Sequence, residues 1–170
     1  NYSEAIEVLK SVAESSVKLD PFLLLHLIRL LVRVNRFKSA AEYLKLSLSL
    51  DPPYFFMVKC ERLLQKIISS GEWHPRQTLR IAILSSSTSS FLNTVLQAAC
   101  FKADIHADIY ECGFGVYRQD ILDSSSALYG FKPQAVILLL NQRDLSLAPQ
   151  GNAGIAQQVN TDLRNLWSIL

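Results

Sequence analysis

The sequence predicts an α/β protein in which a small three-layer parallel sheet follows an α-helical region. Two observations lead to this fold class. Up to residue 71 the apolar residues recur with the period of helices, and from Thr78 onward short apolar runs alternate with helical patterns. Strands that alternate with helices favour right-handed crossovers and a parallel sheet. We therefore divide the chain into a helical region over residues 1–71, a linker over residues 72–78 and an α/β domain over residues 79–170.

The composition is that of a globular protein and argues against two classes of partner. Of the 170 residues, 49% are apolar and 19% are charged, which is ample material for a packed core. The formal net charge is +2 and the basic residues are scattered, so we expect no nucleic acid partner. The apolar run over residues 22–34 is interrupted by His26, Arg29 and Arg33 and is shorter than the roughly 20 residues of a membrane span, so we expect no membrane partner.

The three cysteines, Cys60, Cys100 and Cys112, are odd in number and widely spaced. They form neither a metal-ligand motif nor a disulfide framework. We interpret them as reduced, mostly buried thiols and expect a cytoplasmic protein. The chain begins at Asn1 within an amphipathic pattern, which leads us to expect a piece of a longer protein.

One motif is written twice in the helical region. In each copy an aromatic residue precedes an alanine by three positions and a leucine by seven, and Leu-Asp-Pro ends the segment. The copies start at Tyr2 and Phe37, and the first has four extra residues before its end. Their spacings resemble the packing positions of a tetratricopeptide repeat, in a degenerate form because Ile28 and Ser47 depart from the pattern.

A further helix is predicted over residues 53–69, where it could cap the repeat helices before Gly71 ends it. The sequence leaves two interpretations of the helical region open: a concave face that docks a peptide or protein, or a collar that only packs beside the next domain. Residues 1–76 hold 11 basic and 8 acidic side chains, a charge of +3, and residues 77–170 hold 6 and 7, a charge of −1. A slightly basic helical region would not repel an acidic carrier protein.

The α/β domain contains three predicted strands. We expect strands over residues 79–84, 104–111 and 134–140, helices over 89–101, 117–122 and 155–170, and a polar loop over 145–154. The last strand is an almost unbroken apolar run, so we expect it at the centre of the sheet, buried on both faces. Three strands make a small, incomplete sheet, and we expect at least one further element after residue 170.

A cluster of hydroxyl residues, 85–90, lies between the first strand and its helix, at the end where open α/β sheets bind ligands. Ser86 and Ser87 are candidate nucleophiles. Gly113 or Gly115 after the second strand and Asn141 after the third are candidate donors to an oxyanion. This order is similar to the SGNH hydrolase family.

The general base that a serine nucleophile needs is missing from this arrangement, because residues 141–170 contain no histidine. Ser87, Thr88 or Ser89 could instead cap the following helix. We therefore predict no catalytic residue, with Ser86 and Ser87 as the weak candidates, and no metal site, because Asp104, Asp108 and Glu111 alternate as on a solvated face. The predicted ligand-binding residues are Ser86, Ser87, Thr88, Gly115, Asn141 and Asp144.

Four segments together resemble the amino-terminal region of FkbH-like proteins: RIAILSSST (80–88), IYECGFGVYRQDILD (109–123), SALY (126–129) and KPQAVILLL (132–140). The resemblance covers about residues 79–145. It implies a degenerate SGNH-like or flavodoxin-like fold joined to a haloacid-dehalogenase-like domain that loads a glyceryl unit onto an acyl carrier protein in polyketide biosynthesis. The Asp-x-Asp motif and catalytic cysteine of that domain are not in this sequence, and Ser85 stands where such families keep glycine.

The resemblance implies no cofactor for this chain, since Mg²⁺ is expected only in a following dehalogenase-like domain. The preferred hypothesis is a non-catalytic module that positions an acyl carrier protein, or its pantetheine arm, for that domain of a glyceryl or phosphoryl transferase. The alternative is a fragment of an SGNH-type serine esterase or acyltransferase that uses Ser86 or Ser87.

Overall fold

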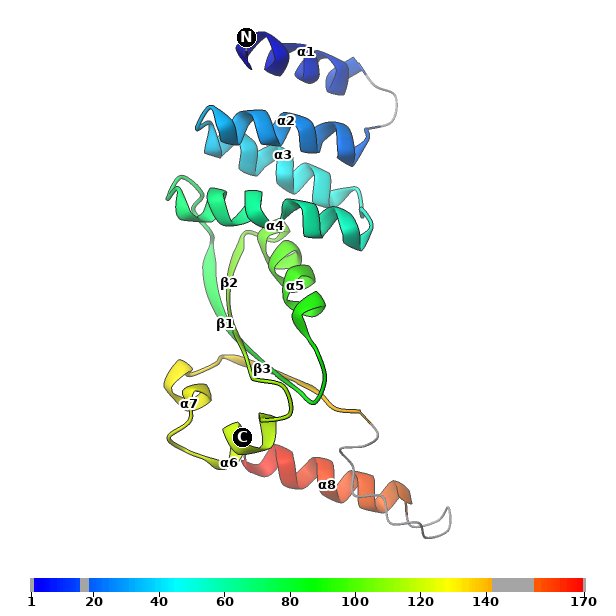
Figure 1. Cartoon of the computed structure of the whole chain (residues 1–170), viewed down its shortest axis with the longest axis vertical. Coiled ribbons are helices and arrows are strands. Elements are labelled where there is room, and N and C mark those ends of the chain that lie inside the picture. Colours follow the sequence, from blue (N-terminus) through cyan, green and yellow to red (C-terminus); the bar gives the residue numbers. More distant parts are fainter. Residues whose placement is uncertain (1, 16–18, 142–154, 170) are drawn as a thin grey trace. The chain divides into compact units, whose positions relative to one another are not determined.

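The structure is a computed structural model that describes residues 2–15, 19–141 and 155–169 (Figure 1). The elements in chain order are α1 (Tyr2–Ser15), α2 (Pro21–Arg33), α3 (Phe37–Ser49), α4 (Tyr54–Ser69), β1 (Gln77–Ser85), α5 (Ser90–Lys102), β2 (Ile105–Glu111), α6 (Tyr117–Leu122), α7 (Ala127–Phe131), β3 (Ala135–Leu139) and α8 (Ile155–Ile169). Helices followed by a parallel sheet with helices between its strands confirm the predicted α/β fold class.

The chain divides into two compact units. Unit 1 comprises Asn1–Thr78 and Phe91–Ala107, and unit 2 comprises Leu79–Ser90 and Asp108–Leu170. Unit 1 contains the repeat helices, and unit 2 contains the hydroxyl-rich turn after β1.

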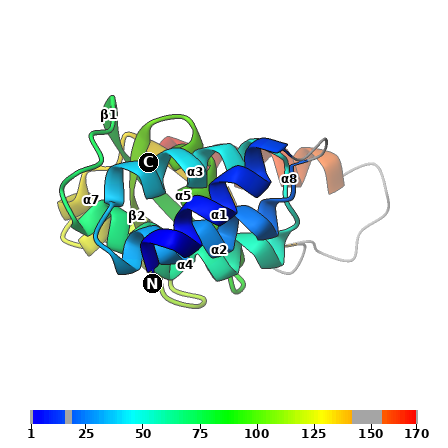
Figure 2. The same cartoon turned by 90° about the horizontal axis from the view of Figure 1, so that it is seen from above.

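Unit 1 is built on the repeated motif. α1 and α3 begin at its aromatic residues, Tyr2 and Phe37. Asp20 caps α2, because its carboxylate accepts a hydrogen bond from the Phe22 N–H at 2.9 Å, and Pro21 suits the first turn because it has no N–H to satisfy. α1 packs on α2, α2 packs on α3 and α4, and α3 packs on α4, which is the stacking of repeat helices (Figures 1 and 2).

The two positions that depart from the repeat pattern both lie in the core. Ile28 and Ser47 are each 0% exposed. The Ser47 hydroxyl donates to the Tyr43 carbonyl at 2.8 Å, so the polar group is satisfied inside the apolar stack. The degenerate repeat therefore keeps its packing at both positions.

The segment between α4 and β1 anchors an aromatic ring in unit 1. Trp73 is 8% exposed, and its ring centroid lies 4.6 Å from that of Phe101 in α5. At the turn after α5, Asp104 has a φ of 61° and forms an ion pair with Lys45 of α3. Asp104 thus lies before β2 and pairs with a cation, so the prediction that it belongs to the solvated face of a strand is wrong.

The sheet has the order β2-β1-β3, so β1 is its central strand. β1 and β3 pair in parallel, from Ile81 opposite Ala135 to Ser85 opposite Leu139. The prediction that the third strand is central and buried on both faces is wrong: β3 lies at the edge, and its five residues are all half-buried. An apolar run indicates that a strand contacts a packed core, but it does not indicate whether other strands pair with that strand on one side or on both.

The core of unit 2 joins the sheet to short helices. Ala82 and Leu84 of β1 pack with Tyr117 and Ile121 of α6 and with Leu128 of α7. α6 lies where the sequence predicts it, whereas α7 was not predicted because five residues are too short for a helical period. α6 also contacts α8.

α8 coincides with the predicted last helix, and the predicted polar loop before it lies outside the described residues. Among its apolar residues, Val159 is half-buried and Leu163 is 39% exposed. In the described part of the chain, no helix is both long enough and apolar enough to cross a bilayer.

Candidate functional site

The turn after β1 is a hydrogen-bonded network that begins at Ser85. This residue is 1% exposed. Its hydroxyl donates to the Leu139 carbonyl at 3.4 Å and accepts from the Ser87 N–H at 3.1 Å. Ser85 therefore ties the ends of β1 and β3 together, and its hydroxyl proton is used inside the turn.

Ser86 and Asn141, both predicted to bind a ligand, meet where β1 and β3 end. The Ser86 hydroxyl oxygen accepts two hydrogen bonds from Asn141, one from the backbone N–H at 3.3 Å and one from Nδ2 at 3.1 Å. Both Asn141 groups are donors, and among the described residues no acceptor is found for the Ser86 hydroxyl proton. Ser86 is half-buried and Asn141 is exposed, which leaves the pair accessible.

Ser87 and Thr88 form the outer part of the turn. Both are exposed, and no hydrogen bond of either hydroxyl is described for this part of the chain. The structure thus brings three predicted binding residues, Ser86, Ser87 and Asn141, into one neutral, polar strand-end cluster with Thr88 beside it.

Ser89 fastens the turn to the second strand. It is 2% exposed, and its hydroxyl donates to Glu111 Oε1 at 2.5 Å. The interpretation of Glu111 as part of a solvated face is therefore wrong, because its carboxylate is half-buried and bound. Ser89 stands immediately before the first residue of α5, so the bond also brings a carboxylate near a helix N-terminus, where negative charge is favoured.

Cys112 closes the same end of the sheet. Its N–H donates to the Ile83 carbonyl at 3.1 Å, and its sulfur accepts from the Ser85 N–H at 3.2 Å. Burial raises the pKa of the Cys112 thiol. The Cys112 side chain therefore links the end of β2 to the end of β1. Sequence reasoning assigned this cysteine only to the core, because a lone thiol after a strand carries no motif.

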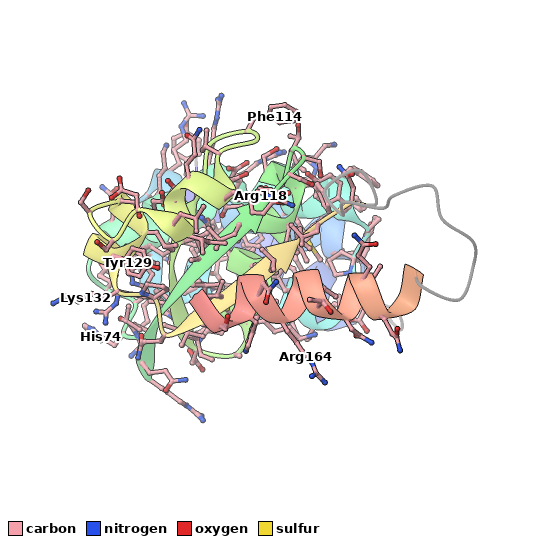
Figure 3. The ribbon with its side chains drawn as sticks, turned by 90° about the horizontal axis from the view of Figure 1, so that it is seen from below. His74, Phe114, Arg118, Tyr129, Lys132 and Arg164 are labelled. Carbon is pink, nitrogen blue, oxygen red and sulfur yellow. The ribbon has the colours of Figure 1, made fainter. Side chains whose placement is uncertain are left out.

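The loop after β2 turns away from this cluster. Gly115 has a φ of 72°, a left-handed conformation that favours glycine, and Phe114 is 79% exposed and projects outward (Figure 3). Among the described residues, no hydrogen bond joins Gly115 to Ser86 or Asn141. Asp144, the remaining predicted binding residue, lies outside the described residues.

The loop-and-helix segment over residues 113–129 is held mainly by its own hydrogen bonds. The Tyr110 hydroxyl donates to Asp120 at 2.7 Å, and burial, reinforced by this carboxylate, raises the pKa of Tyr110 to about 12. The Ser126 hydroxyl donates to the Asp120 carbonyl and the Tyr129 hydroxyl to the Ile121 carbonyl, each at 2.7 Å. These polar groups stabilise α6 and α7 and are not directed into the strand-end cluster.

The histidines of the sequence lie outside unit 2. The three histidines of the sequence, His26, His74 and His106, all belong to unit 1. His106 lies in β2, half-buried, with its ring edge-on to Trp73 at 6.2 Å between centroids. Where the chain is described, no group of His, Cys, Asp and Glu side chains could hold a metal ion. Ser86 therefore has no imidazole in its own unit to accept its proton.

A groove of about 620 Å³ lies between β3 and α8. Its lining is mostly apolar and is formed by Leu138, Asn160, Leu163, Arg164, Trp167 and Ser168. Figure 3 shows α8 with Arg164, and Trp167 is 63% exposed. Leu138, the groove residue on β3, lies three residues before Asn141, or about 10 Å along an extended chain. Sequence reasoning missed this groove because the stripe of α8 reads as a buried face.

Comparison with known proteins gives little further guidance. No family model matches the sequence, and no curated protein matches it. Among solved structures, the chain is similar to the crystal structure of the N-terminal part of protein BF1531 from Bacteroides fragilis, which contains a phosphatase domain and is complexed with Mg. The two are 18% identical, the match covers 55% of this chain and 25% of that chain, and the TM-score is 0.46. This chain thus spans a quarter of the other, and a likeness this distant carries no argument about fold or function.

Proposed function

We propose that unit 2 is a non-catalytic binding module and that its ligand is the pantetheine arm of an acyl carrier protein. The contact between Ser86 and Asn141 carries the proposal. Within the described residues it leaves the Ser86 hydroxyl proton without an acceptor, in a unit that has no histidine to remove that proton. Neutral hydroxyl donors suit amide carbonyl groups, and pantetheine is a chain with two amides.

The groove between β3 and α8 supports an elongated ligand of this kind. Leu138, Leu163 and Trp167 offer apolar surface to the aliphatic part of the arm. Arg164 supplies a cation that suits the phosphodiester by which the arm joins its carrier protein. The resemblance of residues 79–145 to FkbH-like proteins supports the further proposal that the module serves glyceryl loading by a dehalogenase-like domain.

The test is a titration of the isotope-labelled protein, followed by NMR, with free pantetheine and with an acyl carrier protein in its holo and apo forms. We expect pantetheine and the holo form to perturb the amides of residues 85–89 and 141, and the apo form to leave them unchanged. Asn141→Ala should weaken binding about tenfold through the loss of the Nδ2 donor that helps to orient the Ser86 hydroxyl. Ser124→Ala, on an exposed residue of the α6–α7 turn, is the matched control.

Two results would contradict the proposed ligand. One is the absence of any perturbation at millimolar pantetheine, and the other is an equal response in the Asn141→Ala variant. Stoichiometric labelling of Ser86 or Ser87 by a fluorophosphonate would contradict the non-catalytic role and favour the serine esterase.

A further inference from the structure

Two rows of side chains in unit 1, one on α2 and one on α4, repeat each other. Each row begins with an aromatic residue and continues with a basic residue at the fourth, seventh and eleventh positions after it. The α2 row consists of Phe22, His26, Arg29 and Arg33, and the α4 row consists of Phe55, Lys59, Arg62 and Lys66. Equivalent members are 33 positions apart. Steps of three and four residues keep each row on one face of its helix.

The two rows lie side by side, and together they form the basic surface of unit 1. α2 packs on α4, and the first members of the rows, Phe22 and Phe55, stack with 5.2 Å between ring centroids. The Lys59 ammonium lies 5.7 Å from the Phe22 centroid and 5.4 Å from that of Phe55. Further along the helices, burial raises the pKa of Cys60 in α4 to about 12, and the charge of Arg29 opposes this rise. Arg29 therefore lies near α4 as well.

The pattern of the two rows is shared although the core pattern of the two helices is not. Leu25 and Ile28 are buried in α2, whereas the residues 33 positions later, Val58 and Glu61, are exposed on α4. The basic members of both rows are all exposed. Exposed charged side chains contribute little to a packed core, so packing does not explain why the rows match. Their match indicates a role for the surface itself.

The basic surface carries a charge that its own helices do not neutralise. α2 contains no acidic residue, and the acidic residue of α4, Glu61, lies two positions after Lys59 and so points to the other side of the helix. Among the described residues, no ion pair involves the five lysines and arginines of the two rows. Arg33 lies over the Tyr2 ring, 4.8 Å from its centroid, a contact that leaves its charge in place.

We propose that the basic surface docks a short acidic segment of a partner polypeptide. Carboxylates of the segment pair with the lysines and arginines of the rows, since such charge-assisted hydrogen bonds are among the stronger polar contacts in proteins. An apolar side chain of the segment packs on Phe55, which is 52% exposed and is held by its stack with Phe22.

The dimensions and the charge of the chain favour this partner. The basic members of each row extend over seven residues, or about 10 Å of helix, which about three residues of an extended peptide span. Nucleic acid binding relies on a broader basic surface, whereas the net charge of the sequence is only +2. The inference concerns unit 1 and does not depend on the ligand proposed for unit 2.

The test is a selection of random dodecapeptides, displayed on phage, against the immobilised chain. Fluorescence anisotropy then measures the affinity of a fluorescein-labelled peptide from the enriched pool. We expect the pool to be enriched in Asp and Glu together with an aromatic or aliphatic residue, and the affinity to fall as salt rises. Arg62→Glu should weaken binding at least about tenfold, because it places a carboxylate against those of the peptide.

Lys38→Glu is the matched control, because Lys38 is an exposed basic residue on α3 of the same unit and the substitution changes the net charge equally. It should change the affinity less than about twofold. A pool without an excess of Asp and Glu, or equal losses of affinity in the two variants, would overturn the proposal. Tighter binding of a labelled oligonucleotide than of any enriched peptide would also overturn it and would assign the basic surface to nucleic acid.

Discussion

The two copies of the repeat predict that the same substitution lowers the free energy of unfolding by different amounts at equivalent positions. Leu44→Ala and Leu9→Ala remove the same atoms at equivalent positions, but Leu44 is 0% exposed and Leu9 is half-buried. We expect Leu44→Ala to lower the free energy of unfolding of unit 1 by about 3–4 kcal/mol, through lost transfer energy and a cavity. Leu9→Ala should cost less, about 1–2 kcal/mol, because that side chain is already partly exposed to water and no closed cavity forms.

The assay is urea denaturation followed by tryptophan fluorescence. The sequence has two tryptophans, of which Trp73 is buried in unit 1 and Trp167 is exposed on α8 of unit 2. A Trp167→Phe background therefore makes the signal report on unit 1 alone. Equal costs for the two alanine variants, to within about 0.5 kcal/mol, would refute the argument that the difference in burial between Leu44 and Leu9 sets the cost.

Three further outcomes follow from contacts described above. Ser89→Ala leaves the half-buried Glu111 carboxylate without its hydrogen-bond donor. We expect it to lower the free energy of unfolding of unit 2 by about 1–2 kcal/mol and to speed amide exchange at the end of β2. Unchanged exchange would contradict this. The hydrogen bond from Lys45 lowers the pKa of Asp104, so this stabilisation is present above the unfolded pKa and is lost as the pH falls through the folded one. Asp104→Asn should therefore flatten the fall in Tm between about pH 5 and pH 3, and a parallel fall in both proteins would exclude the ion pair as the cause. Burial raises the pKa of all three thiols, yet Cys100 is only half-buried, so iodoacetamide should modify it first as judged by peptide mass mapping.

The helices and the order of elements were predictable because the spacing of apolar residues and the residues that cap or end a helix are local properties of the sequence. Asp20 caps the N-terminus of α2, and Pro21 is its first residue. The aromatic residues Tyr2 and Phe37 are the first residues of α1 and α3. α7, with five residues, has no period to detect. The place of β3 at the edge depends on pairing between strands remote in sequence, which a single apolar run does not encode.

The position of the candidate site was predictable from the sequence, but its hydrogen-bond network was predictable only in part. The end of β1 was predicted from strand-turn-helix order, and the structure does bring Ser86 and Asn141 together there. Glu111 and Cys112 were missed because their roles depend on contacts with Ser89 and Ser85 across the sheet. A carboxylate and a thiol at the end of a strand, next to a turn rich in hydroxyls, are the signal that would have found them.

The edge position of β3 has a consequence for the protein in concentrated solution. Natural sheets guard their outer strands with charges, prolines, bulges or a covering segment. The five residues of β3, Ala-Val-Ile-Leu-Leu, include neither a charge nor a proline. Among the described residues no strand pairs with the outer side of β3, so its main-chain groups there are a template on which a further strand can align, and in concentrated solution that strand can come from another molecule.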